Sequence, residues 1–435
     1  MNLYSGNENY KLYHGNMLDM LEVIDKESID SIVTDPPYEL NFMGKGWDNS
    51  GIAFQKETWG KCYEVLKPGG YLLAFGGSRT FHRIAVAIED AGFEIRDTIM
   101  WLYGSGFPKS MNIGLAIDKK NGVESKIVGY EKTTMPDFRD VGKKQKEISG
   151  IDKLTFGQIE NSERKETPIY EAQNEWQGWG TCLKPSFEPI IVARKPFKGS
   201  LVDNVLEYGV GGINIDECRV ETNDILKECI SSGSVGLGEM IKGHKYIPNE
   251  IGRFPANTIM TYDINDYKEV CSGFKSKEEE YNARYFYCAK ASKKDRDEGL
   301  DEFEEKNMRT EQNRRIHSAG CEYYENGKLK QNPHLQSSIK RNIHPTVKPT
   351  ELMQYLVRLV TPNGGTILDP FNGSGSTGKA VMYENKEYNK NYKYIGIELT
   401  EEYLPISKAR IEYVCNLKKE INPQISIFDL EDNNE

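Results

Sequence analysis

The sequence predicts an α/β fold built on a doubly wound parallel sheet. Three observations support this prediction. Strand and helix signals alternate over the first hundred residues, the same alternation returns after residue 364, and a glycine-rich turn joins a strand to a helix in that last part. Strands that alternate with helices in this way are typical of a parallel sheet covered by helices on both faces.

The expected elements fall into an N-terminal and a C-terminal group. We expect strands at 29–35, 71–77, 93–103, 364–371 and 392–399, and helices at about 53–66, 80–91, 373–385 and 401–417. Lys67-Pro68-Gly69-Gly70 should end the first helix and Gly92 the second, because proline and glycine do not continue a helix.

The middle of the chain lacks this alternation. Residues 115–175 are polar with weak periodicity, and residues 188–194 form one apolar, strand-like run. Residues 199–340 are irregular and rich in charge. This irregular region is either a separate module or a large insertion in the sheet.

The composition excludes several classes of protein. The 435 residues carry 56 Lys and Arg against 66 Asp and Glu, a net charge of −10. This excludes a uniformly basic nucleic-acid-binding protein, although an average leaves room for a local basic groove. The mean hydropathy of −0.63 and the lack of long apolar runs exclude membrane spans. The eight cysteines include no C-x-x-C pair, so we expect reduced thiols, a cytoplasmic protein and no metal site.

A glycine-rich turn opens the helix expected at 373–385. Gly373, Gly375 and Gly378 fit the pattern G-x-G-x-x-G, and Glu398 follows 20 residues later at the end of the next strand. Glycines let a ligand approach the helix N-terminus, and an acidic residue at the next strand tip binds a ribose diol. The pattern therefore predicts an adenosyl cofactor and leaves NAD, FAD and S-adenosylmethionine open. Asp369 favours S-adenosylmethionine, because a carboxylate attracts an amino group and repels a pyrophosphate.

A second motif, Asp35-Pro36-Pro37-Tyr38, follows the first expected strand. The prolines carry no N–H and fix the backbone, so the segment offers two acceptors, the Asp35 carboxylate and the Pro36 carbonyl, and no donor. A primary amine needs such a pair of acceptors. Drawing on the hydrogens of an exocyclic base amine frees its lone pair for a methyl sulfonium, and Tyr38 offers a face on which a flipped base stacks.

Together the two motifs resemble those of the amino-methyltransferases of DNA, which methylate adenine N6 or cytosine N4. The family signature is present as DPPY at 35–38 and FNGSGST at 371–377. Because the catalytic motif comes first, the chain is similar to the β group, in which the recognition region lies between the motifs. LKPGG at 66–70, Trp101 and HPTVKP at 344–349 extend the similarity.

The resemblance implies a Rossmann-like S-adenosylmethionine-dependent methyltransferase fold of permuted order, with a large inserted target-recognition region. It divides the chain into a catalytic half at 1–114, an insertion at 115–175, a core strand region at 176–198, a target-recognition region at 199–340 and a cofactor-binding half at 341–435.

The resemblance also implies the catalytic residues. Asp35 and Pro36 would polarise the target amine, with Pro37 and Tyr38 completing the catalytic motif. Tyr38 would stack on the flipped base, with Trp101 or Tyr103 on its other side.

The same resemblance implies which residues contact the cofactor. This set is Asn16, Asp369, Phe371, Gly373, Gly375, Ser376, Thr377, Glu398, His344, Thr346 and Lys348. Glu398 would hold the ribose, and the three residues from the HPTVKP segment would lie near the methionine end. Family members often have Gly-Asp near the start of the chain, where this sequence has Gly15-Asn16, so either Asn16 or Asp19 would contact the cofactor adenine.

The target base is expected to be adenine, because Asp before Pro-Pro-Tyr is commoner in the adenine enzymes of the family. Cytosine N4 is the alternative. A nicotinamide-dependent dehydrogenase is a more distant one, since it would explain the glycine pattern but gives Asp35 no role. A DNA-binding protein without activity is a further alternative, against which the intact motifs argue.

Double-stranded DNA is the expected partner, and residues 309–348 are the expected basic contact. This stretch has a net charge of +5, and asparagines and glutamines are interspersed among its basic residues. We expect phosphate contacts from Arg309, Arg314, Arg315, Lys340 and Arg341. A solvated basic loop is the alternative. The resemblance leaves open whether the chain forms a homodimer and whether a cognate restriction nuclease exists.

Overall fold

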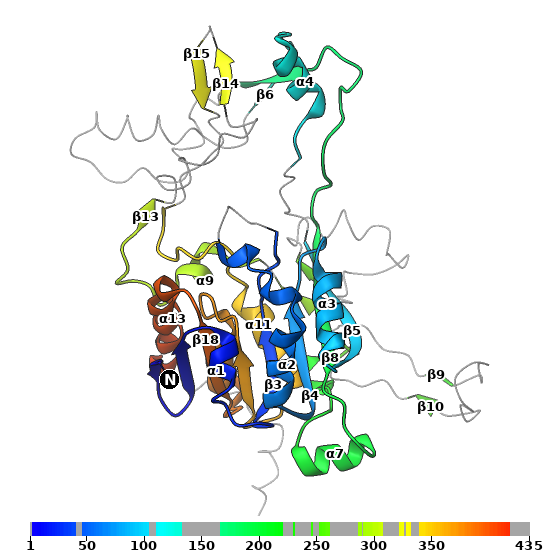
Figure 1. Cartoon of the computed structure of the whole chain (residues 1–435), viewed down its shortest axis with the longest axis vertical. Helices are drawn as coiled ribbons and strands as arrows, with labels where there is room; N and C mark the ends of the chain where they lie inside the picture. Colours follow the sequence, from blue (N-terminus) through cyan, green and yellow to red (C-terminus); the bar gives the residue numbers. More distant parts are fainter. Residues whose placement is uncertain are drawn as a thin grey trace, which may run out of the picture. The chain divides into compact units, whose positions relative to one another are not determined.

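The protein is described by a computed structural model (Figure 1). It describes residues 2–40, 46–103, 110–132, 166–220, 229–230, 245–246, 252–261, 286–288, 290–307, 322–325, 328–331 and 339–417. The chain divides into two compact units. The first comprises residues 1–105, 186–309 and 337–435, and the second comprises residues 106–185 and 310–336.

The first unit is built on a sheet of ten strands within the described residues. In spatial order they are β1 (Leu3–Gly6), β2 (Tyr10–His14), β18 (Lys393–Glu398), β17 (Thr366–Asp369), β3 (Ile29–Thr34), β4 (Leu66–Phe75), β8 (Phe187–Arg194), β5 (Glu94–Tyr103), β11 (Thr258–Thr261) and β12 (Phe286–Tyr287). Neighbours pair in parallel from β2 to β4 and from β5 to β12, while β8 runs antiparallel to both of its neighbours and β1 is antiparallel to β2.

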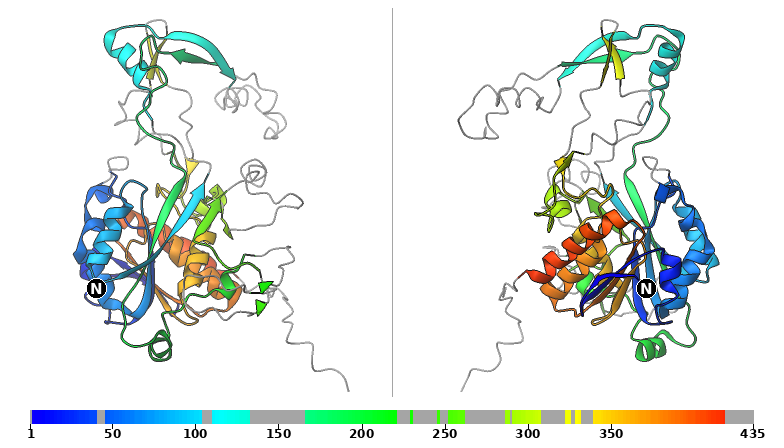
Figure 2. Two further views of the ribbon diagram at one scale, coloured as in Figure 1. Left: turned by 90° about the vertical axis from the view of Figure 1, so that its right-hand side faces the viewer. Right: turned by 60° about the vertical axis from the view of Figure 1, so that its left-hand side comes forward.

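Helices cover both faces of this sheet (Figures 1 and 2). One face carries α1 (Met17–Leu21), α2 (Lys56–Val65) and α3 (Phe81–Asp90), and the other carries α11 (Thr350–Val360), α12 (Ser376–Tyr388) and α13 (Leu404–Asn416). Each of these two helical layers is therefore formed by one terminal part of the chain, in agreement with the predicted α/β fold.

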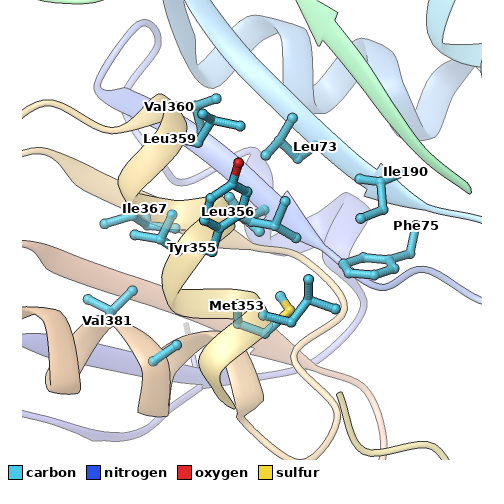
Figure 3. Close-up of a cluster of buried hydrophobic side chains, with 14 of the residues drawn as sticks. Leu73, Phe75, Ile190, Met353, Tyr355, Leu356, Leu359, Val360, Ile367 and Val381 are labelled. Atoms are coloured by element: carbon cyan, nitrogen blue, oxygen red, sulfur yellow. The ribbon is translucent and has the colours of Figure 1, made fainter. Parts of the chain in front are cut away.

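The core consists of two apolar layers, one on each face of the sheet. Neighbouring residues of a central strand belong to different layers: Ile32 packs with α2 and α3, whereas Val33 packs with α11. Figure 3 shows the second layer, which includes Met353 and Leu356 of α11 together with Leu73 and Phe75 of β4. Both faces are buried, and each large apolar side chain removed from water contributes roughly 1.5–3 kcal/mol.

The predicted strands and helices of both terminal parts are confirmed, with shifts of a few residues at their ends. One boundary differs in kind. The segment after Val65 ends the helix as expected, but β4 already begins at Leu66 and includes the two glycines. The Gly69 N–H donates to the Lys195 carbonyl and the Lys195 N–H to the Gly70 carbonyl, so pairing with the chain after β8 extends the strand.

The remaining elements are short. The first unit also contains α7 (Leu201–Tyr208), α9 (Lys293–Asp297), the pairs β9 (Cys229–Ile230) with β10 (Lys245–Tyr246) and β13 (Lys306–Asn307) with β16 (Ile339–Lys340), and 3-10 turns at Gly46–Asn49, Ile52–Phe54, Asp216–Cys218 and Glu401–Tyr403. The second unit contains α4 (Ile113–Asn121) and the antiparallel pairs β6 (Lys126–Lys132) with β7 (Glu166–Glu171) and β14 (Glu322–Glu325) with β15 (Lys328–Gln331). Every helix in the described ranges is too short or too polar to cross a lipid bilayer.

Candidate active site

The carboxyl ends of β3, β17 and β18 meet at one edge of the sheet. These parallel neighbours end at Thr34, Asp369 and Glu398. The Thr34 hydroxyl donates to Asp369 Oδ1 over 2.6 Å and ties the first two ends together. Ligands of α/β sheets bind at this edge, so the fold brings the two sequence motifs to one place.

Asp35 lies directly beyond β3 and forms an ion pair with Lys348. The distance from Lys348 Nζ to Asp35 Oδ2 is 2.6 Å, and only 9% of the lysine side chain is exposed. The other oxygen, Oδ1, is buried and accepts no hydrogen bond from the described residues. Burial raises the pKa of the Asp35 carboxyl, while the ammonium opposes that rise.

Glu188, near the start of β8, is a second carboxylate at the same place. Its Oε2 accepts from the Tyr38 hydroxyl over 2.9 Å and lies 3.4 Å from Lys348 Nζ. Burial lowers the pKa of Lys348, but the attraction of Asp35 and Glu188 outweighs burial and raises it overall. The ammonium is therefore shared by two carboxylates.

The Tyr38 ring lies beside this ion pair. Lys348 Nζ is 5.2 Å from the centre of the ring, and the Thr80 hydroxyl donates to the Tyr38 carbonyl over 2.8 Å. Glu39 and Leu40 directly follow the motif, and their backbone N–H groups donate to the Asp48 carboxylate. These bonds fix the backbone on which the Tyr38 ring is held.

The glycine-rich turn follows β17 and leads into α12. Gly375 has a φ of 74°, and a Cβ there would lie 2.5 Å from Ser407 Oγ. A Cβ on Gly378 would lie 2.5 Å from Tyr394 Cε1 and 2.6 Å from Ile411 Cδ1. The first glycine is required by the turn and the second by close packing of helix against strand.

Asp369 is buried at the base of this turn. In addition to Thr34, it accepts from the Thr377 hydroxyl over 2.7 Å and from the Phe371 N–H over 3.1 Å. Burial raises its pKa to about 6, although the hydrogen bonds from both threonines oppose the shift. The carboxylate thus holds the turn against the end of β3.

Glu398, at the tip of β18, bends back onto the turn. Its Oε2 accepts from the Gly373 N–H and its Oε1 from the Thr400 N–H, both over 2.7 Å. Burial raises its pKa, and these backbone hydrogen bonds oppose the rise. A carboxylate oxygen can accept more than one hydrogen bond, so Glu398 retains capacity for a further donor.

The other residues of the expected cofactor set surround the same turn. Half-buried His344 lies against Gly373, and desolvation together with three nearby cations lowers its pKa to about 3, so its imidazole is neutral at pH 7. Phe371 contacts Trp59, and the Ser376 hydroxyl donates to the Lys348 carbonyl. Asn16 caps α1 by accepting from the Leu18 N–H.

Two of the expected residues differ from the others in their burial. Thr346 is exposed, in contrast to its neighbours in the HPTVKP segment. Trp101 belongs to the core of the sheet, with 3% of its surface exposed, and its ring contacts that of Tyr103. In this structure neither Trp101 nor Tyr103 presents an open face, because both rings are buried.

Most of the expected DNA contacts fall outside the described residues. This applies to Arg309, Arg314 and Arg315, and of Lys340 only the backbone in β16 is described. Arg341 is described, and its guanidinium pairs with Asp301 at 3.1 Å and with Glu305 at 3.9 Å.

The structure adds two residues that our sequence analysis did not select. Glu188 lies in an apolar strand and shows no pattern apart from its charge. Arg410 is fully buried in α13, where it donates to the Ser374 carbonyl and the Ser376 hydroxyl beneath the turn. Burial lowers its pKa to about 10, so it remains charged at neutral pH. The available signal for Arg410 was its position in α13, four residues from the apolar Ile406 and from Val414, where a basic residue is unusual.

The arrangement suits the binding of a ligand that donates N–H hydrogen bonds. It combines a carboxylate with an orphaned oxygen, a donor-free proline pair and an aromatic ring next to a glycine-rich turn with an acidic strand tip. An orphaned buried acceptor costs about 1–3 kcal/mol, and a ligand N–H would relieve that cost.

Comparison with known proteins identifies relatives of this chain. A family model described as DNA methylase (N6_N4_Mtase) matches residues 29–409. The type II methyltransferase M.HindIII of Haemophilus influenzae is 22% identical over 275 residues, which cover 52% of this chain and 74% of the relative. The DNA adenine methyltransferase YhdJ of Escherichia coli is 32% identical over 105 residues, 23% of this chain and 35% of the relative.

A solved structure is similar over most of its length. The PvuII DNA methyltransferase, described as cytosine-N4-specific, aligns with 97% of this chain and 92% of its own, at 14% identity and a TM-score of 0.41.

Proposed function

Because this chain belongs to the N6_N4_Mtase family of DNA methylases, we propose that it transfers a methyl group from S-adenosylmethionine to adenine N6 at a specific site in double-stranded DNA. Asp35 carries the proposal. Its Oδ1 is buried without a hydrogen-bond donor from the described residues, directly after β3 and before two prolines. An amine entering this corner supplies the missing donor.

The residues of the turn fit the methyl donor. Glu398 retains acceptor capacity for a ribose hydroxyl, and Gly373 lets the turn lie close to His344, since a Cβ there would lie 3.0 Å from His344 Nε2. The donor supplies an electrophilic methyl group on a sulfonium. Neutral His344 adds no positive charge next to that sulfonium.

The chain's own residues hold the base for direct transfer. Tyr38 stacks on the flipped base, and Asp35 and the Pro36 carbonyl accept the two amine hydrogens. The amine lone pair then forms the new N–C bond, the C–S electron pair stays with sulfur, and the extra proton leaves the nitrogen to water. Stacking worth roughly 1–3 kcal/mol helps to offset the few kcal/mol needed for base flipping.

Adenine is proposed over cytosine because of Asp35. Asp in this position is typical of the adenine enzymes that the motif resembles, and the relative YhdJ is named as an adenine methyltransferase. Cytosine N4 methylation is the second candidate, since the same acceptors serve either amine.

The target site would be read by residues 199–340, with the basic stretch at 309–348 contacting phosphates. A homodimer and a cognate nuclease are compatible with this proposal and are not required by it.

The test is methylation of unmethylated plasmid and chromosomal DNA with S-adenosylmethionine carrying a labelled methyl group. The DNA is then digested to nucleosides and separated. Label in N6-methyldeoxyadenosine is the expected result. Label in N4-methyldeoxycytidine would establish the second candidate, and unlabelled DNA would refute both.

A further inference from the structure

The Lys348 ammonium contacts the Asp35 carboxylate, which the target amine would also contact, on Oδ2 next to the unpaired Oδ1. It contacts Asp35 Oδ2 at 2.6 Å and lies 5.2 Å from the centre of the Tyr38 ring, beside the face on which a base would stack. Both groups are cations with N–H donors: the lysine ammonium has three, and an exocyclic amine that has just been methylated has two. In the absence of DNA, the lysine therefore mimics the cationic nitrogen that the reaction produces.

Charge counting shows why this ammonium cannot stay on Asp35 during transfer. Methyl transfer makes the amine nitrogen positive, and a second cation on the same carboxylate would repel it. Asp35, Glu188 and Lys348 together carry a net charge of −1, which matches one incoming positive charge. The site is balanced for the reaction only if the lysine is neutralised by a carboxylate other than Asp35.

Glu188 is that second carboxylate. Its Oε2 already lies 3.4 Å from Lys348 Nζ, and it also accepts from the Tyr38 hydroxyl. Moving the ammonium from one carboxylate to the other needs only a rotation near the end of the lysine side chain. Other charged groups are close by: Asp369 lies near Asp35, and Lys290, 3.5 Å from the centre of the Tyr103 ring, lies near Glu188.

We propose that Lys348 and Glu188 are positioning residues: Lys348 neutralises Asp35 before DNA binds and passes to Glu188 when the base enters. This inference rests on the proposed function. It assigns Glu188 a role in admitting the base and none in binding the methyl donor, which the turn after β17 and the tip of β18 would hold.

The test compares four proteins in transfer of labelled methyl groups to plasmid DNA: wild type, E188Q, K348M and the double variant. E188Q leaves an amide that still accepts from Tyr38 but no longer neutralises the lysine, so the net charge of the site becomes 0. The double variant restores −1 and removes the competitor. E94Q is the matched control, because it removes a carboxylate from the neighbouring strand that pairs with Arg194 at 2.7 Å, away from the site.

We expect E188Q to lower kcat/KM for DNA by about 10- to 100-fold, and the double variant to recover at least about tenfold of that loss. Binding of S-adenosylmethionine to E188Q without DNA, measured by calorimetry, should differ from the wild type by less than about threefold, which also verifies folding. Wild-type kcat/KM with E188Q, or a double variant less active than E188Q, would overturn the inference alone. Unlabelled DNA with the wild type would overturn the proposed function together with it.

Discussion

Asp35 and Lys348 are separated by 313 residues in the chain, yet their side chains meet at 2.6 Å. Asp35 follows β3 in the N-terminal part, and Lys348 precedes α11 in the C-terminal part. The contact joins the Asp35-Pro36-Pro37-Tyr38 motif to the segment that precedes α11 and the glycine-rich turn. It explains how a permuted chain builds one site from its two ends.

Replacing Asp35 by alanine should abolish methyl transfer and spare donor binding. Lys348 keeps Glu188 as a partner at 3.4 Å, so the variant leaves no buried cation without a counter-charge. We expect a fall in kcat of at least about a hundredfold. The dissociation constant for S-adenosylmethionine, measured by calorimetry, should stay within about threefold. Equal loss of both properties would contradict the separation of roles.

Replacing Glu398 by alanine should mainly weaken donor binding. One charged hydrogen bond is worth about 1.5–3 kcal/mol, which corresponds to a loss of affinity of roughly 10- to 100-fold. Glu398→Gln is the control, because it keeps one acceptor for the Gly373 or Thr400 N–H while removing the charge. An unchanged dissociation constant in the alanine variant would remove Glu398 from the site.

Gly378→Ala tests the packing of the turn helix. Its Cβ would meet Tyr394 and Ile411 at 2.5 and 2.6 Å, so we expect a loss of about 1–3 kcal/mol in the free energy of unfolding. Gly60→Ala is the matched control, since that glycine lies within α2 with no atom within 4 Å of the new Cβ. Alanine there should stabilise the protein by about 0.5–1 kcal/mol. Urea unfolding would measure both, and equal effects would contradict the packing argument.

Asp369 should make stability depend on pH. Its pKa is raised from 3.8 to about 6 in the folded protein, so the carboxyl favours folding while protonated. That contribution is complete below about pH 4 and is lost as the pH rises through 6, a change of about 3 kcal/mol. In Asp369→Asn the difference in unfolding free energy between pH 4 and pH 7 should change by this amount. An unchanged difference would show that the folded-state pKa of Asp369 is ordinary.

The basic stretch should govern the salt dependence of DNA binding. Replacing Arg314 and Arg315 by alanine should reduce the slope of log K against log salt by about 2, because each phosphate contact contributes roughly 0.9. Arg341→Ala should change the slope less, since Asp301 and Glu305 already pair with that guanidinium. Fluorescence anisotropy over a salt series measures the slope. Identical slopes for the wild type and the double variant would exclude these arginines from the contact.

The sequence predicted the parts of the fold that follow local patterns. The apolar runs, and the glycines and prolines between them, predicted the strands that end at Thr34, Asp369 and Glu398. Parallel pairing then required the ends of these strands to meet. Local pattern could not give the direction of β8, because an apolar run of eight residues reads the same in either direction. α11 has a clear apolar face but follows an irregular region, and we did not predict it.

The site was predictable where a motif constrains the backbone, and not where a contact spans the chain. Asp35 and the glycine turn are selected by their neighbours in sequence. The resemblance assigned Lys348 to the methionine end of the cofactor, whereas the structure places its ammonium on Asp35 and Glu188. Three residues from distant segments share that interaction, and no spacing rule relates them.

The most direct test of the account is a crystal structure with the donor analogue sinefungin and a duplex that carries the methylation site. The account predicts a flipped adenine on Tyr38, with its N6 about 2.6–3.2 Å from an Asp35 carboxylate oxygen. A base amine outside hydrogen-bond reach of Asp35, with Lys348 still bound to that carboxylate, would contradict it.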